Sequence, residues 1–138
     1  MHATSSNVFT DDMDLMFHVQ NYPWQRIIQY MPHLEVDHVG NLQADSVDLL
    51  SSLGEYIAKE VAPLASRLSE EKPSLKNKVV TVAPTMQKIF AGLAEMGALG
   101  VSVSPKYGGL GFPLMLSHCT SQLLARTDIS LGNAYAYY

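Results

Sequence analysis

The spacing of apolar residues between positions 47 and 68 constrains the fold of this 138-residue chain more than any other feature of its sequence. Apart from the neighbours Leu53 and Gly54, steps of three and four residues separate these positions, as on one face of an α-helix. We expect Asp45 or Ser46 to cap the start of this helix, and Pro63 to bend it without ending it. The apolar positions are Val47, Leu50, Leu53, Gly54, Ile57, Val61, Leu64 and Leu68.

Prolines mark the first turns of three further helices, because a proline at the first helical position loses no hydrogen bond there. Pro23 opens a short helix over 24–31, and Pro113 opens a longer one. Pro84 opens a helix that we expect to end at Gly97, because glycine readily adopts the left-handed conformation that follows a helix. The residues expected to face the core from the helices opened by Pro84 and Pro113 are Met86, Ile89, Phe90, Leu93, Leu116, Cys119, Leu123 and Leu124.

The two ends of the chain carry shorter helix signals. Three acids at the start of 11–20 favour a short helix there, because carboxylates stabilise the positive end of the helix dipole. Either Asp128 or Ser130 should start the last helix. Residues 1–10 are polar, and we expect them to be disordered. One face of the first helix carries Met13, Met16, Phe17 and Gln20.

Four segments between these helices lack a helical pattern. We expect loops over 32–43 and 70–82 and a short extended piece over 100–103. The segment 105–111 should form a tight turn, because its glycines supply positive φ angles without steric cost. Four to six helices without convincing strands predict an all-α helical bundle.

Composition and charge exclude several classes of function. Hydrophobic residues make up 47% of the chain, too many for a disordered protein. The net charge is −4 and no run of Lys or Arg occurs, so nucleic acid is not an expected partner. The chain has neither a stretch of about 18 apolar residues, as a membrane span needs, nor the pattern of a signal peptide. The single Cys119 fits a reducing compartment, and we expect a cytoplasmic protein.

Few residues in this sequence suggest chemistry. The run Gly108–Gly111 lacks the Lys and Ser/Thr of a phosphate-binding loop, which favours a structural turn. Neighbours on a helix point about 100° apart, so His118 and Cys119 should not form a thiol–imidazole pair, and Cys119 should be a buried small hydrophobe. The other histidines lack the spacing of metal ligands, and we expect no metal site. They are His2, His18, His33 and His38.

Three short segments carry a resemblance to a known family. They are Leu93–Gly97, Tyr107–Gly111 and Leu123–Asp128. Together they resemble the N-terminal helical domain of the acyl-CoA dehydrogenase family, flavin enzymes that oxidise acyl thioesters at Cα–Cβ. The resemblance covers residues 44–138, which leaves 1–43 as an N-terminal extension with short helices.

Two further segments are similar to one branch of that family. Asp12–Phe17 and Val79–Pro84 resemble a branch that has a longer subunit with an N-terminal extension and includes enzymes acting on methylthiopropanoyl-CoA. The family resemblance implies a β middle domain and a helical C-terminal domain, which hold most of the FAD between them. Because both are absent from this sequence, we expect the chain to be an inactive N-terminal fragment that lacks the catalytic base.

The same resemblance implies that the last helix forms one wall of the acyl-chain tunnel. Gly132, Asn133 and Ala136 occupy the positions that would border the acyl tail. Acyl-CoA, an electron acceptor and a homo-oligomeric assembly are implied for the whole enzyme, whereas no residue here is assigned as catalytic, flavin-binding or metal-binding. The alternative interpretation is a non-enzymatic helical module that pairs with a separate subunit through its apolar C-terminal face.

Overall fold

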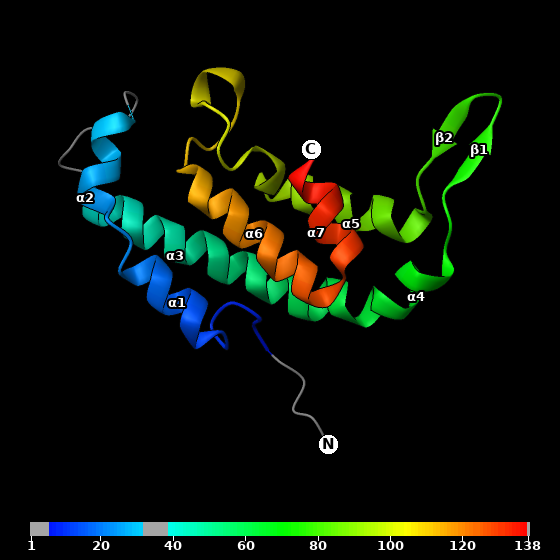
Figure 1. Cartoon of the computed structure of the whole chain (residues 1–138), viewed down its shortest axis with the longest axis horizontal. Helices are drawn as coiled ribbons and strands as arrows, with labels where there is room; N and C mark the ends of the chain where they lie inside the picture. Colours follow the sequence, from blue (N-terminus) through cyan, green and yellow to red (C-terminus); the bar gives the residue numbers. More distant parts are fainter. Residues whose placement is uncertain (1–5, 32–38, 138) are drawn as a thin grey trace.

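The computed structural model describes residues 6–31 and 39–137 and shows an assembly of helices with one small hairpin (Figure 1). The all-α fold is therefore as predicted. The first and sixth α-helices both pack against the long third helix. The α-helices are α1 (Met13–Gln20), α2 (Trp24–Ile27), α3 (Val39–Tyr56), α4 (Ala65–Glu70), α5 (Pro84–Glu95), α6 (Leu114–Thr127) and α7 (Ile129–Ala136). The short helical segments are η1 (Ile28–Tyr30), η3 (Ile57–Val61), η4 (Ala62–Leu64), η5 (Ala98–Gly100) and η6 (Pro105–Tyr107).

One hydrophobic core joins the N-terminal segments to the later helices. Its members come from the segment before α1, from α1, α2 and α3, from η3, and from α5 through α7 with the connection between α5 and α6. Burying each large apolar side chain contributes about 1.5–3 kcal/mol, so the N-terminal segments stabilise the same core as the rest. The largest fully buried side chains are Phe9, Val19, Ile28, Leu50, Leu53, Ile57, Ile89, Leu93, Leu116, Leu123, Leu124 and Leu131.

The long helix begins earlier than expected. The prediction that Asp45 or Ser46 caps it is wrong, because α3 starts at Val39 and both residues lie inside it. The Ser46 side chain is buried, and its hydroxyl donates a hydrogen bond to the Leu42 carbonyl at 2.5 Å. Serine can satisfy its hydroxyl in this way inside a helix as well as at a cap. The expected loop over 32–43 therefore ends by Val39, and its part at 32–38 lies outside the described residues.

Pro63 interrupts the hydrogen-bond pattern without ending the helical path, as predicted. The preceding segment η3 is a π-helix, in which the Ala62 N–H donates to the Ile57 carbonyl. The tighter turn η4 contains Pro63, and α4 continues to Glu70. A wider turn placed before the proline accommodates its ring and its missing N–H.

Segment 70–82, predicted as a loop, contains a hairpin. Strands β1 (Ser74–Lys76) and β2 (Val79–Thr81) pair in antiparallel register, with Leu75 opposite Val80. The turn residues Asn77 and Lys78 both have positive φ, at 51° and 64°. Positive φ at both central residues is what a type I′ turn requires, and such turns most often carry Asn-Gly, so Asn-Lys gives only a weak hairpin signal in the sequence.

The connection from α5 to α6 confirms two predictions and corrects one. Ile89, Phe90 and Leu93 are buried, and Gly97 ends the helix with a φ of 70°. The predicted extended piece over 100–103 is wrong, because η5 and a turn occupy this stretch. The loop folds back on itself, since the Leu110 N–H donates to the Gly100 carbonyl at 2.9 Å.

Residues 7–10 pack against the later helices, which corrects the expectation of disorder for this part of 1–10, whereas residues 1–5 lie outside the described residues. Phe9 is fully buried, and the Val8 N–H donates to the Gly54 carbonyl at 3.2 Å. Gly54 permits this approach, because a Cβ built on it would lie 2.8 Å from the Cβ of Phe9. Within α1, the buried residues are Leu15 and Val19, and the face with Met13 and Phe17 is exposed.

The last two helices follow the prediction closely. The expected residues Leu116, Cys119, Leu123 and Leu124 are all buried in α6. Asp128 caps α7, because its carboxylate accepts a hydrogen bond from the Ser130 N–H at 2.8 Å. In the part of the chain that the structure describes, no helix has the length and apolarity that crossing a membrane requires.

Candidate functional site

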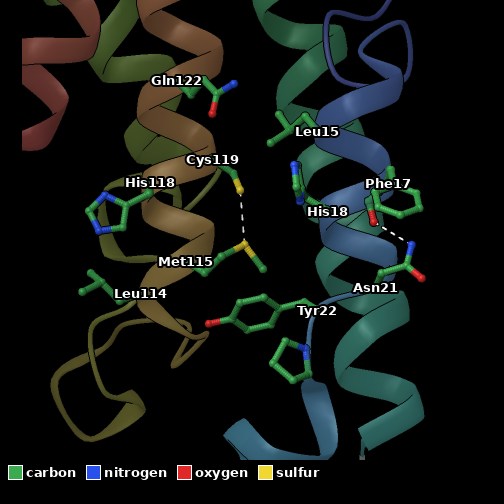
Figure 2. Close-up of a pocket in the computed structure, with 11 residues that line it drawn as sticks. Leu15, Phe17, His18, Asn21, Tyr22, Leu114, Met115, His118, Cys119 and Gln122 are labelled. Carbon is green, nitrogen blue, oxygen red and sulfur yellow. Dashed lines mark hydrogen bonds between the residues drawn. The ribbon is translucent and has the colours of Figure 1, made fainter.

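A groove of about 750 Å³ runs between α1 and α6 (Figure 2). In Figure 2, Leu15 and Tyr22 project toward α6, and Met115 and Cys119 project toward α1. The lining of the groove is mainly apolar, and no Asp, Glu, Lys or Arg occurs among the lining residues that the structure describes. Its lining residues are Leu15, Phe17, His18, Asn21, Tyr22, Pro23, Leu114, Met115, His118, Cys119 and Gln122.

The two sulfur atoms in this groove lie in contact. The thiol of Cys119 donates a hydrogen bond to Sδ of Met115 at 3.2 Å. Burial raises the pKa of Cys119 to about 11, so the thiol stays protonated at neutral pH. His118 points away from Cys119 on the same helix, as predicted (Figure 2). The groove can therefore hold an apolar group, but its thiol is not an activated nucleophile.

Two of the five histidines fall within the described residues, and both are among the residues that line the groove. His18 and His118 are exposed, and His2, His33 and His38 lie outside the described residues. Across residues 6–31 and 39–137, no three His, Cys, Asp or Glu side chains come together in a way that could hold a metal ion.

The backbone N–H groups of the glycine-rich turn form hydrogen bonds within the chain, which agrees with the predicted structural role. The N–H groups of Gly108, Gly109 and Leu110 donate to the carbonyls of Pro105, Ser104 and Gly100, at 2.9–3.3 Å. A Cβ built on Gly109 would lie 2.1 Å from the carbonyl oxygen of Val103. Because these donors are already satisfied, the turn does not fit the phosphates of a flavin nucleotide.

Helix α7 carries the three residues predicted to border an acyl chain, but they do not share one exposed face. Gly132 is buried against α6, where a Cβ would lie 2.5 Å from the Cβ of Ala125. Asn133 and Ala136 are exposed. No residue on the exposed face of α7, within the described range, has a charged side chain. This face consists of Ile129, Ser130, Asn133, Ala136 and Tyr137.

Two contacts that hold α7 and the end of α6 in place were not predicted. The hydroxyl of Tyr135 donates to the Ala98 carbonyl at 2.8 Å, and burial raises the pKa of this tyrosine. Arg126 forms an ion pair with Asp12, whose side chain is largely buried. Both contacts join residues far apart in the sequence, so no local pattern could indicate them.

Comparison with known proteins gives a family match and a distant relative. Residues 43–137 match the family described as acyl-CoA dehydrogenase, N-terminal domain. A 3-methylmercaptopropionyl-CoA dehydrogenase from Ruegeria pomeroyi is 23% identical over 122 residues, which cover 86% of this chain and 20% of that protein. The chain thus spans about a fifth of the length of this relative. No solved structure matches the chain significantly.

Proposed function

The chain belongs to the acyl-CoA dehydrogenase family, and from this premise we propose that it forms the N-terminal helical domain of an FAD-dependent enzyme. The reaction proposed for the whole enzyme removes a proton from Cα of an acyl-CoA thioester and a hydride from Cβ, which leaves a double bond. FAD supplies the hydride acceptor in this reaction. The observation that carries the proposal is the family match across residues 43–137.

We assign a structural role to this domain and no step of the chemistry. The catalytic base and the flavin contacts are not assigned to its residues, and the N–H groups of Gly108 and Gly109 are already used within the chain. The isolated chain should therefore neither hold FAD nor oxidise acyl-CoA. For the whole enzyme we propose acyl-CoA and an electron acceptor as partners, a homo-oligomeric assembly and a cytoplasmic location.

The exposed face of α7 is proposed as one wall of the acyl-chain tunnel. Its lack of charge supports this role, because an alkyl chain gains most from contact with surfaces that need little desolvation. Asn133 and Ala136 present short side chains there. Gly132 would act indirectly, since its missing side chain lets α7 lie close to α6.

The N-terminal segments are proposed to be the extension typical of one branch of the family. The match to the Ruegeria pomeroyi relative covers more of the chain than the 43–137 family match, which supports this assignment. We treat residues 1–43 as the extension and 44–138 as the family domain. Phe9 and Leu15 nevertheless share the core of the later helices, so the extension should be needed for stability.

The coding sequence downstream of the codon for Tyr138 tests the proposal. We expect the reading frame to continue into a β-rich segment and then into further helices. If the frame ends there and no neighbouring frame encodes those domains, the alternative of a helical module that pairs with a separate subunit is favoured. In that case a co-purifying subunit bound through α7 should be found.

A further inference from the structure

We propose that the hairpin arm, residues 72–82, binds the surface of a lipid bilayer that contains anionic headgroups. The arm comprises β1, β2 and the residues that flank them, and it stands away from the helices in Figure 1. Every residue in it is exposed. At its base, Glu71 accepts hydrogen bonds from the N–H and hydroxyl of Thr85, both at 2.8 Å. The inference goes beyond the proposed function and does not depend on it.

The two faces of the hairpin arm differ in polarity. Leu75 and Val80 lie on one face, whereas the other carries Val79 beside Lys76, Ser74 and Thr81. Leu75 pairs with Val80 and Lys76 pairs with Val79, and successive pairs project from opposite faces. Leu75, Val79 and Val80 are 70%, 64% and 65% exposed. An amphipathic arm suits the boundary between headgroups and acyl chains, where Leu75 and Val80 can be covered while Lys76 stays at the level of the headgroups. A hairpin without a packed face is only marginally stable in water, which favours an environment that covers it.

The positive charge of the arm favours binding to an anionic surface. Lys72, Lys76 and Lys78 lie on the arm, and no Asp or Glu occurs between Glu71 and Glu95. Lysine stems can follow apolar surface while their ammonium groups remain in water at the level of the headgroups. Lysines at that level are attracted to anionic lipids, so the arm complements phosphatidylserine better than the neutral phosphatidylcholine.

The acidic remainder of the chain does not prevent this contact. The whole chain has a net charge of −4, which an anionic surface repels. From Lys72 to the turn at Asn77 the arm spans roughly 16 Å at the rise of an extended strand. The Debye length at physiological ionic strength is about 8 Å, so a surface touched by the tip is largely screened from the helices behind it.

Co-sedimentation of the purified 138-residue chain with lipid vesicles tests the proposal. One preparation contains phosphatidylcholine alone, and the other contains equal parts of phosphatidylcholine and phosphatidylserine. We expect the chain to sediment with the mixed vesicles, to bind them less as salt increases, and to stay in solution with phosphatidylcholine alone. Absence of binding to the mixed vesicles overturns the proposal, and it is the result expected if a protein surface covers the arm instead.

Substitutions in and outside the arm locate the binding surface. Lys78→Glu and Leu75→Asp should each weaken binding to the mixed vesicles by roughly tenfold or more. The matched controls are Lys106→Glu and Met13→Asp, because Lys106 is exposed in η6 and Met13 is 83% exposed on α1. The arm has no packed face, so the helices should stay folded, as far-ultraviolet circular dichroism can verify. Equal losses in the controls, or unchanged binding of Leu75→Asp, would mean that the arm is not inserted and that the proposal is wrong.

Discussion

The carboxylate of Asp12 pairs with the guanidinium of Arg126, which lies 114 residues further along the chain. The side chain of Asp12 is only 10% exposed. Its second oxygen accepts a hydrogen bond from the Leu15 N–H at 3.1 Å and so caps α1. One carboxylate thus fixes the start of α1 and ties the N-terminal segment to the end of α6.

Asp12→Ala should lower the free energy of unfolding by about 1–3 kcal/mol, because both the helix cap and the ion pair are lost. Arg126→Gln should cost less, since the cap remains and the guanidinium is mostly exposed. Urea unfolding monitored by Trp24 fluorescence measures both. Asp14→Ala, in the exposed first turn of α1, is the control. An equal loss of unfolding free energy in this variant would mean that the cap and the ion pair of Asp12 add no specific stability.

Gly132→Ala should destabilise the chain by about 1–3 kcal/mol, because the new Cβ would overlap Ala125 at 2.5 Å and force α7 away from α6. Asn133→Ala, one residue along on the exposed face, should change stability by no more than about 0.5 kcal/mol. Thermal unfolding of the two variants without acyl-CoA measures the effect of each substitution on helix packing alone. Equal stability of Gly132→Ala and the unaltered chain would contradict the close approach of the two helices.

Glu71 should make stability depend on pH. The hydrogen bonds from the Thr85 N–H and then the Thr85 hydroxyl lower the pKa of Glu71 below its ordinary value of 4.5. A lowered pKa in the folded state gives stability that is present above 4.5 and is lost as pH falls through the folded-state pKa. We expect Glu71→Ala to be less stable than the unaltered chain at neutral pH, and the difference to shrink in acid. Glu70→Ala is the control, and a difference that grows on acidification would refute the assignment.

Cys119 should react slowly with iodoacetamide in the folded chain. Burial raises the pKa of its thiol to about 11, so little thiolate exists at neutral pH, and the groove lining limits access. The alkylation rate should rise as pH approaches 11 and should rise at neutral pH once urea unfolds the chain. Rapid alkylation at neutral pH without denaturant would show that the thiol is neither buried nor held protonated.

Helix positions followed from the sequence where periodic apolar residues and local stop signals agree. The pattern of α5, closed by Gly97, and that of α6, followed by the Asp128 cap, both match the structure. Each depends on interactions within one or two turns. The helical path past Pro63 was also predictable, although the π-helical turn that accommodates the proline was not.

The features that sequence reasoning missed depend on distant partners. Phe9 lies in a polar segment, and its burial depends on Gly54, 45 positions later, lacking a side chain. On α1, Met13 and Phe17 are larger than Leu15 and Val19, yet the position of α3 buries the second pair. The candidate residues on α7 could be named from a family resemblance, whereas the contact of Tyr135 with Ala98 needed the fold.

The most direct test of the account compares the 138-residue chain with the product of the longer reading frame that we expect. Both proteins are purified, and bound flavin and the oxidation of acyl-CoA thioesters are measured under the same conditions. We expect the longer product to carry FAD and to oxidise an acyl-CoA, while residues 1–138 alone do neither. A 138-residue chain that purifies with stoichiometric flavin, or that oxidises acyl-CoA without further domains, would contradict this expectation.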